Sequence, residues 1–299
     1  LGASGENKMC KLSDISTVKQ ILAKYGFRFS KALGQNFLIN PTVSPKMAEL
    51  CGAGKENTGV LEIGPGIGVL TCELAKRANK VVAVELDRRL IPILNENLSG
   101  FNNIKIINDD IMKVDLKKLL KTEFSGMNVV VCANLPYYIT SPVLMRLLEE
   151  KLEISAITVM VQKEVAQRLC AGAENRKTGS ISLAVNYYSE PELLFSVKKG
   201  SFMPEPKVDS AVVRLNVRKN PPCNVLSEEL FFKVIKMAFL QRRKTVINAL
   251  TGGDAMEVSK PELVEIFERL DILPTKRAEN LSIKQFADLA NELHILGHK

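Results

Sequence analysis

The chain has 299 residues, which is long enough to bury a full core and to form about two domains. Apolar residues make up 46% and charged residues 25%, the composition of an ordinary globular protein, so a fibrous or disordered chain is excluded. The net charge of +8 favours a polyanionic partner, nucleic acid rather than a membrane. A positive excess that serves only solubility is the alternative.

Six scattered cysteines form no C-x-x-C pair, and the chain has only two histidines. This usage argues against a zinc site or any other metal centre, and it fits a reduced, cytoplasmic setting better than a disulfide framework. No apolar run reaches the ~20 residues that a membrane-spanning helix needs. Met9 resembles a natural initiator, so we interpret residues 1–8 as a remnant of cloning.

Short apolar runs alternate with amphipathic stretches from Val60 to about Asn216. The runs predict strands at 60–63, 81–85, 104–107, 129–133, 155–161, 180–188 and 210–215. The stretches between them predict helices at 69–76, 88–98, 142–150 and 163–170. This alternation is typical of βαβ units and predicts a doubly wound α/β domain with a mostly parallel sheet.

The pattern changes after the proline pair Pro221-Pro222. Helical periodicity then predicts helices at 228–239, 244–250, 261–270 and 283–293, with no strong strand pattern. We therefore expect an N-terminal segment over residues 1–24, an α/β domain over 25–218 and a smaller all-helical domain over 219–299.

A glycine-rich loop, Glu62-Ile63-Gly64-Pro65-Gly66-Ile67-Gly68, lies between a predicted strand and a predicted helix. Glycines there let the backbone approach a ligand closely. Glu85 ends the next strand, where such folds place a carboxylate on ribose hydroxyls. The spacing is G-x-G-x-G with Val69 in the last position, not the G-x-G-x-x-G of a dinucleotide site. A nucleoside without a pyrophosphate, such as S-adenosyl-L-methionine, fits better.

An acidic pair, Asp109-Asp110, follows the third strand. Asp110 is the better candidate to accept a hydrogen bond from an adenine amino group. A solvated turn at the end of a strand explains the pair equally well.

The tetrad Asn134-Leu135-Pro136-Tyr137 ends the apolar run 129–133. Pro136 has no N–H group and a fixed φ, so the strand must stop there. A turn stiffened by proline can hold carbonyl oxygens rigidly beside an aromatic ring, and these groups suit the exocyclic amine and ring of a flipped nucleobase. Taken alone, the tetrad is more simply a strand-end turn with a packed tyrosine.

Six segments together resemble a known family. They are Leu33–Leu38, Glu62–Gly68, Glu85–Asp87, Asn134–Tyr137, Phe202–Ser210 and Gln241–Thr245. In this order they resemble the KsgA/RsmA family of bacterial small-subunit rRNA adenine N6,N6-dimethyltransferases, over about residues 25–287. The resemblance implies a class I, Rossmann-like methyltransferase fold, and dimethylation of two adjacent adenosines in the 3′-terminal hairpin loop of 16S rRNA.

The resemblance also implies residue roles and partners. Its S-adenosylmethionine contacts correspond to Asn36, Leu38, Gly64, Glu85, Asp110 and Asn134, and Gly66 belongs to the same glycine loop. The implied partner is the immature 30S ribosomal subunit at a late assembly stage, with the protein acting as a monomer in the cytoplasm and without a membrane partner. Tyr138 is a departure, since many family members have asparagine there, and it puts the local lining of the pocket in doubt.

The expected reaction needs correct positioning of the adenine amine and no general base. We expect the Asn134 side-chain oxygen and the Leu135 carbonyl to accept from the adenine N6 amine, with Pro136 as the stiffener. Tyr137 would stack on the base, and Phe202 would form the second face. Without the resemblance, Phe202 is more simply a core residue.

Basic residues are the expected RNA contacts, because phosphate electrostatics dominate nucleic-acid affinity. The candidates are Lys31, Lys198, Lys199, Lys207, Arg242, Arg243 and Lys244. Each of them can also be a solvated surface charge. The helical domain is interpreted as a ribosome-docking element.

Three alternatives stay open at this stage. An Erm-like enzyme would methylate large-subunit rRNA, but those proteins usually have isoleucine at the position of Leu135. A ribosome-assembly protein would bind without depending on methylation. A nicotinamide dehydrogenase is disfavoured by the glycine spacing.

Overall fold

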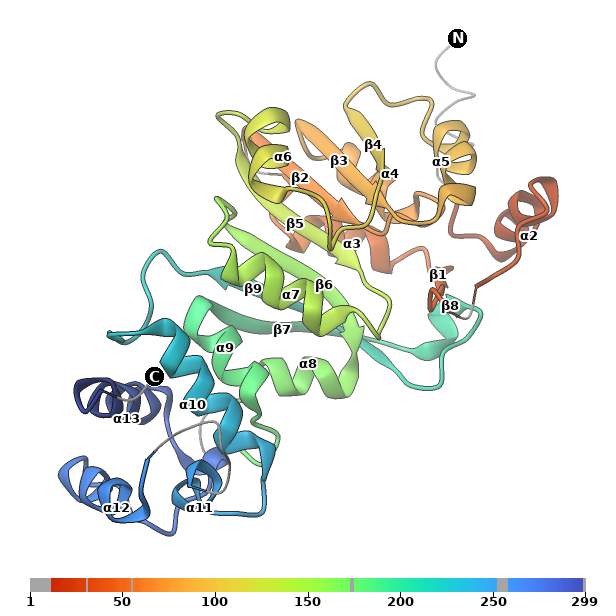
Figure 1. The fold of residues 1–299 in the computed structure, drawn as a ribbon. Helices are drawn as coiled ribbons and strands as arrows, with labels where there is room; N and C mark the ends of the chain where they lie inside the picture. The colour runs from red at the N-terminus through yellow and green to blue at the C-terminus, as the bar shows by residue number, and fades with distance from the viewer. Residues whose placement is uncertain (1–11, 31, 55, 173–174, 252–257, 298–299) are drawn as a thin grey trace. The chain divides into compact units, whose positions relative to one another are not determined.

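The computed structural model describes residues 12–30, 32–54, 56–172, 175–251 and 258–297. The chain forms two compact units, one from Leu1–Ala166 with Glu192–Val217 and the other from Gln167–Pro191 with Arg218–Lys299 (Figure 1). The sequence predicted boundaries after residues 24 and 218. The two units divide after Val217, next to the second of these, and Gln167–Pro191 also belongs to the second unit. Residues 12–24 belong to the first unit and do not form a unit of their own.

A seven-stranded sheet forms the centre of the first unit, in the order β4-β3-β2-β5-β6-β9-β7. The strands are β2 (Thr58–Ile63), β3 (Lys80–Glu85), β4 (Ile104–Asn108), β5 (Asn128–Asn134), β6 (Ala156–Gln162), β7 (Ser189–Val197) and β9 (Ser210–Val217). Strands β2 to β6 pair in parallel, and β9 pairs with β6 in antiparallel fashion. The predicted mostly parallel sheet is confirmed.

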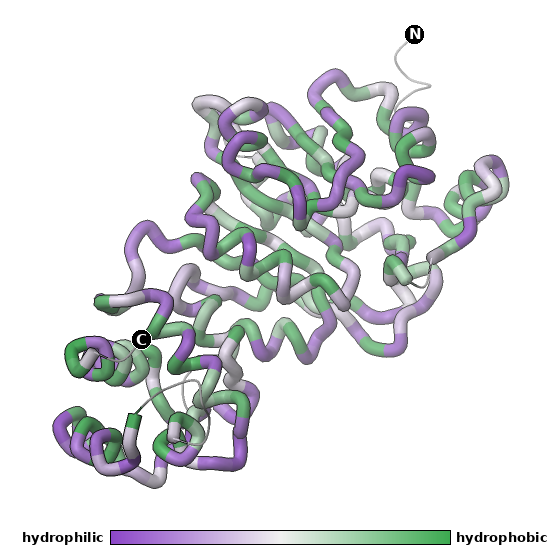
Figure 2. The backbone as a smooth tube through the Cα atoms, in the orientation of Figure 1, coloured by the Kyte–Doolittle hydropathy of each residue, from purple (hydrophilic) through white to green (hydrophobic). Residues whose placement is uncertain are grey.

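Both faces of this sheet are buried. Val60, Val81 and Val130 share a core cluster with helices α3 (Val43–Leu50) and α4 (Val69–Ala75). Leu61 and Val131 alternate with them along the strands, point to the opposite face, and are also fully buried. The central strands are accordingly coloured hydrophobic almost throughout in Figure 2, as expected for a parallel sheet covered on both sides.

The first unit contains further helices besides α3 and α4. They are α2 (Ile15–Lys24), α5 (Ile91–Asn97) with the 3-10 turn Arg88–Leu90 before it, α6 (Leu116–Glu123) and α7 (Thr140–Glu149). Helix α8 (Lys163–Leu169) spans the division between the units. Strand β2 is the switch point of the order, since β3 and β4 follow on one side and β5 and β6 on the other. In open α/β sheets such a point forms a crevice at the carboxyl ends of the strands.

The predicted strand at residues 180–188 is wrong, because Ser180–Tyr188 forms helix α9. The Gly179 N–H group donates to the Ser182 hydroxyl at 3.0 Å, which fixes the first turn. Ser182 to Val185 are buried consecutively and do not alternate. A short apolar run fits either element, and packing of Tyr187 against Phe231 and Phe232 in the second unit decides for a helix.

Several elements were not predicted from the sequence. They are α2, α3, α6, β7 and the two-stranded sheet of β1 (Phe37–Leu38) and β8 (Phe202–Met203). Strand β7 lies at the edge of the main sheet and contains Pro191, so its buried pattern is weak. β1 and β8 have two residues each, too few for a periodic pattern.

Four of the predicted helices lie in the second unit, and all four are confirmed. They are α10 (Glu228–Leu240), α11 (Val246–Leu250), α12 (Lys260–Arg269) and α13 (Ile283–Ile295). Phe231, Phe267 and Phe286 are fully buried among them. Helix α11 begins two residues later than predicted, because Thr245 caps it by accepting from the Asn248 N–H group. Among the described residues, no helix is both long and apolar enough to cross a bilayer.

Candidate functional site

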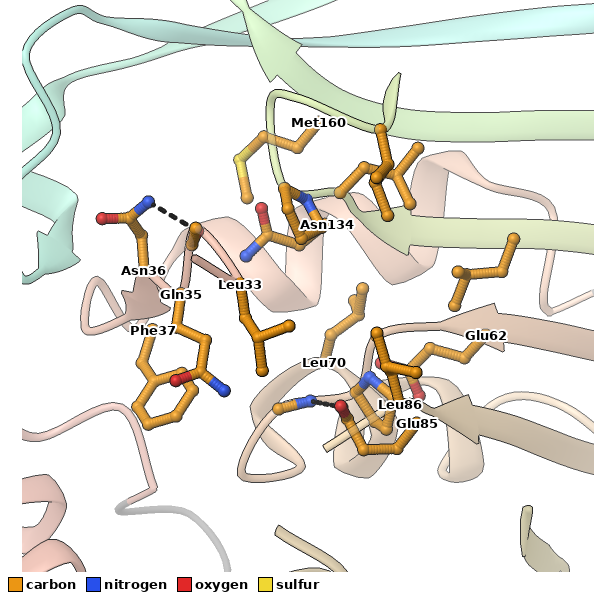
Figure 3. Close-up of a pocket in the computed structure, with 18 of the residues that line it drawn as sticks. Leu33, Gln35, Asn36, Phe37, Glu62, Leu70, Glu85, Leu86, Asn134 and Met160 are labelled. Atoms are coloured by element: carbon orange, nitrogen blue, oxygen red, sulfur yellow. Dashed lines mark hydrogen bonds between the residues drawn. The ribbon is translucent and has the colours of Figure 1, made fainter. Parts of the chain in front are cut away.

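A cavity of about 300 Å³ opens at the carboxyl ends of β2, β3 and β5 (Figure 3). Its volume is in the range of small-molecule sites. All the catalytic and cofactor-binding candidates line it: Asn36, Leu38, Gly64, Gly66, Glu85, Asp110, Asn134, Leu135, Pro136, Tyr137 and Phe202. The structure thus brings together residues from 36 to 202, although their ligand contacts stay predictions.

The glycine loop forms one wall of the cavity. Gly64, Gly66 and Gly68 have φ values of 70°, 61° and 93°, which residues with a side chain rarely adopt. A Cβ on Gly68 would also lie 3.1 Å from the Leu98 side chain. The loop therefore needs these glycines for its own conformation, and α4 begins directly after it at Val69.

Glu85 ends β3 and is 6% exposed. Its two carboxylate oxygens accept from the Asp87 N–H group at 2.8 Å and the Gly66 N–H group at 3.2 Å (Figure 3). Burial outweighs these hydrogen bonds and raises the pKa of Glu85 to about 7. The result is a positioned acceptor that holds a proton more readily than an ordinary glutamate.

Asp110 lies beyond the end of β4 and is partly exposed. One of its oxygens accepts from the Met112 N–H group at 2.9 Å, and the other lies 3.9 Å from the Lys113 ammonium group. Its neighbour Asp109 also lines the cavity and is exposed. The carboxylate of Asp110 is therefore held by its own turn while still lining the cavity.

The tetrad forms the opposite wall. Asn134 is the last residue of β5, and the Leu135 side chain is 2% exposed, so its burial in the core anchors the turn. The Pro136 carbonyl accepts from the Ile139 N–H group at 3.2 Å. In the part of the chain that the structure describes, no group donates a hydrogen bond to the Asn134 side chain or the Leu135 carbonyl. These two oxygens are acceptors ready for a ligand.

Tyr137 is half-buried, and its hydroxyl lies 2.9 Å from the Ser210 hydroxyl at the start of β9. Burial raises the pKa of Tyr137, so the phenol stays neutral and keeps this bond at physiological pH. The ring is thus fixed at both ends, by the backbone turn and by β9. Tyr138, beside it, is 55% exposed.

Phe202 reaches the site through the small sheet. Phe202 pairs with Leu38, and Met203 pairs with Phe37, so β8 lies beside the Asn36–Leu38 segment. The Phe202 side chain is 3% exposed and belongs to the core cluster, although it also lines the cavity. Its packing matches the simpler sequence interpretation, and the stacking role stays a prediction.

The proposed RNA contacts do not share one environment. Lys31 lies outside the described residues. The Lys198 ammonium lies 3.3 Å from Asp209 and that of Lys199 2.8 Å from Glu205, so both charges are partly neutralised, whereas Lys207 is exposed.

The remaining three candidates lie in the second unit, in the turn between α10 and α11. Arg242 donates to the carbonyls of Arg176 and Thr178, so it fixes the local chain. Arg243 and Lys244 are exposed.

Glu62 is a site residue whose role was not predicted from the sequence. It lines the cavity from β2, is 1% exposed, and has no hydrogen-bond partner for either oxygen among the described residues. Burial raises its pKa to about 8, and the nearby Thr71 hydroxyl offsets only part of this shift. A carboxylate inside the apolar run Val60-Leu61-Glu62-Ile63 was the available indication.

The family and its members agree with this geometry. The model of the family described as ribosomal RNA adenine dimethylase matches residues 26–294. The chain is 45% identical to Ribosomal RNA small subunit methyltransferase A from Alkaliphilus oremlandii, and the match covers 95% of this chain and 99% of that protein. The protein of the same name from Geobacillus sp. (strain WCH70) is 47% identical over the same shares.

Two solved structures show the same architecture. A dimethyladenosine transferase from Plasmodium falciparum superposes with a TM-score of 0.72 at 26% identity, over 88% of this chain and 99% of that one. The 23S rRNA methyltransferase ErmE gives a TM-score of 0.65 at 26% identity, over 87% of this chain and 100% of that one. Family model, relatives and cavity agree: the chain belongs to the ribosomal RNA adenine dimethylase family.

Proposed function

We propose that this protein dimethylates the N6 amines of two adjacent adenosines in the 3′-terminal hairpin loop of 16S rRNA. Family membership gives the reaction class, an S-adenosylmethionine-dependent dimethylation of adenine in small-subunit rRNA. The adjacent pair, the hairpin loop and the immature 30S subunit are the finer parts of the proposal. We propose further that the protein acts in the cytoplasm, as a monomer and late in subunit assembly.

The single observation that carries the proposal is one cavity with two unlike walls. On one wall Glu85 is a buried, positioned acceptor beside the glycine loop, which suits ribose hydroxyls. On the other wall, the Asn134 side chain and the Leu135 carbonyl make no hydrogen bond with a described residue, and they lie beside an anchored tyrosine ring. The first wall fits S-adenosylmethionine and the second fits an adenine edge.

When bound, S-adenosylmethionine supplies an electrophilic methyl group on a positively charged sulfur. The chain's own contribution is position and electrostatics. The Asn134 oxygen and the Leu135 carbonyl accept from the N6 amino group and aim its lone pair into the cavity. The same oxygens stabilise the positive charge that develops on nitrogen. Tyr137 stacks on the base, which is worth about 1–3 kcal/mol.

The proposal is tested by methyl transfer to defined ribosomal particles. Radiolabelled S-adenosylmethionine is incubated with the protein and 30S subunits from a strain that lacks the modification, and the rRNA is analysed by mass spectrometry. We expect N6,N6-dimethyladenosine at two neighbouring positions. Label on 50S subunits instead would identify an Erm-like enzyme, and no label on either would refute the proposal.

The same particles separate catalysis from a binding role in assembly. Glu85→Ala should abolish methylation at low cofactor concentration and leave subunit binding intact. If assembly effects persist in this variant, binding contributes on its own. Arg243→Ala should weaken binding and lower the salt slope by about one counterion, and an unchanged slope would exclude a phosphate contact.

A further inference from the structure

A segment near the N-terminus lines part of the cavity. We call residues 27–30 and 32–38 the strap. Leu33 to Leu38 line the cavity, and Asn36 and Leu38 are two of the proposed cofactor contacts. Leu38 also pairs with Phe202 through the small sheet. The strap therefore carries ligand-facing residues but is separate in sequence from the β3 end, which carries Glu85.

Gln35 forms the polar link between the strap and that strand end. Its side-chain amide donates to Asp87 at 2.7 Å, and its side-chain oxygen accepts from the Ser30 N–H group at 2.9 Å. Figure 3 shows the Gln35 side chain beside the Phe37 ring. One side chain thus joins two points of the strap to Asp87.

Asp87 is 7% exposed, and its carboxylate accepts four hydrogen bonds. One is from Gln35, and three are from Arg89: the backbone N–H at 3.1 Å, Nε at 2.9 Å and Nη2 at 2.6 Å. Arg89 also holds the strap, since its guanidinium lies 4.8 Å from the centre of the Phe27 ring and donates to the Arg28 carbonyl at 3.3 Å. Asp87 is therefore the shared acceptor of two groups that grip the strap.

The backbone of Asp87 completes the connection to the ligand-facing carboxylate. Its N–H group donates to Glu85 at 2.8 Å, and the other oxygen of Glu85 accepts from Gly66. The Phe37 ring of the strap would lie 3.4 Å from a Cβ on Gly66, so the strap also touches the glycine loop. Strap, β3 end and glycine loop form one network around the cavity.

We propose that Asp87 is a positioning residue that sets cofactor affinity by tying the strap, through Gln35, to the end of β3. The proposal rests on the proposed cofactor roles of Asn36, Leu38 and Glu85. With the link intact, the strap contacts are in place before the ligand binds, so binding does not have to order them. Without it, the ligand must order the strap itself, and affinity falls.

The test uses the full chain and S-adenosylhomocysteine, titrated by calorimetry without RNA. Gln35→Met keeps the size of the side chain but removes both of its hydrogen bonds. We expect about tenfold weaker binding, the effect of losing a hydrogen bond to a charged group. Asp87→Asn should weaken binding at least as much. The double variant should lose less affinity than the product of the two single losses, because both changes remove the same Gln35–Asp87 bond.

Two readouts separate positioning from loss of fold. The KM for S-adenosylmethionine should rise by the same factor as the dissociation constant, while kcat at saturating cofactor stays within about twofold. Without ligand, amide exchange of the strap should be faster in Gln35→Met than in the unaltered chain, and saturating ligand should slow it more in the variant. If the link served only stability, the variant would have a lower melting temperature but no selective rise in KM over kcat.

A matched control removes a different side-chain interaction near the N-terminus. Lys24→Gln removes an exposed ion pair with Glu96 at 2.6 Å, which joins α2 to α5. It should leave cofactor affinity unchanged. An equal loss of affinity in this control, or wild-type affinity in folded Gln35→Met, would overturn the proposal. Failure of the unaltered chain to bind S-adenosylhomocysteine would overturn the proposed function as well, whereas missing rRNA label with normal binding would count only against the function.

Discussion

The ends of β3 and β5 face the same cavity but are built in opposite ways. At the end of β3, Glu85 accepts two backbone hydrogen bonds and the next acidic residue, Asp87, accepts four. At the end of β5, no described group donates to the Asn134 side chain or the Leu135 carbonyl. The acceptors at the end of β3 are therefore held by hydrogen bonds within the protein, whereas those at the end of β5 accept none from a described residue.

This difference corresponds to two tasks within one reaction. A cofactor with fixed hydroxyls is best held by a rigid, prearranged carboxylate. A base that is methylated twice needs acceptors that become engaged as charge develops on nitrogen. Changes at the β3 end should therefore act mainly on cofactor affinity. Changes at the β5 end should act mainly on turnover, although Asn134 is also one of the proposed cofactor contacts.

The largest effect is expected from Asn134→Ala. Losing one acceptor at the charged transition state should lower kcat by about 10²–10³-fold, while binding to the 30S subunit persists. Single-turnover methylation measures the loss. Asn128→Ala, at the exposed start of the same strand, is the control and should retain full turnover. Equal effects of the two changes would contradict an acceptor role.

Glu62 lies on β2, between β3 and β5 in the sheet, and it should make the free energy of unfolding depend on pH. Burial raises its pKa to about 8, so the folded state binds the proton more tightly than the unfolded state. The stabilisation is complete below about pH 4.5 and is lost as the pH rises to about 8. Between pH 5 and 8 the free energy of unfolding should fall by on the order of 3 kcal/mol from this group.

Denaturant unfolding of the apo chain across this pH range measures that loss. Glu62→Gln should remove much of the slope, and the smaller contribution of Glu85 should persist. Glu153→Gln, at an exposed position, should leave the slope unchanged. A slope unaffected by Glu62→Gln would mean that this carboxyl is ionised in the folded state at neutral pH.

Glu85→Gln should separate cofactor affinity from turnover. The amide replaces one acceptor by a donor that faces an N–H group, so S-adenosylhomocysteine should bind about tenfold more weakly with kcat nearly retained. In the unaltered chain, affinity should decline as the pH falls below about 7, because Glu85 becomes protonated.

Calorimetric titration at pH 6 and 8 shows whether this decline disappears in Glu85→Gln. Glu123→Gln is the control, since Glu123 pairs with Lys80 at the start of β3. A decline with pH that survives in Glu85→Gln would assign it to another group.

The smallest effect should come from Tyr137→Phe, which keeps the ring but loses the bond to Ser210. We expect a change in kcat/KM of about threefold. Tyr137→Ala, which removes the ring, should cost about tenfold or more, with cofactor affinity unchanged. If both variants lose equally, the hydroxyl rather than the stacked ring carries the role.

Much of this protein was predictable from its sequence. Buried β-branched runs such as Val129–Val131, separated by amphipathic stretches, predict a parallel sheet whatever the packing details. The glycine loop and Glu85 were predictable because a strand–glycine–helix turn and a carboxylate one strand later need only local geometry. The helical C-terminal region followed from periodicity alone.

Tertiary structure decided the rest, because the deciding contacts are remote in sequence. Residues 180–188 form a helix because of packing against α10, and no local pattern contains that contact. Two-residue strands pair Leu38 with Phe202 across more than a hundred positions. Asn36, next to this pair, lines the same cavity as the tetrad. The Gln35–Asp87 bond forms only when two remote segments meet in the fold, and the same is true of the burial of Glu62, whose oxygens have no hydrogen-bond partner among the described residues. Burial and hydrogen-bond partners are properties of the folded chain.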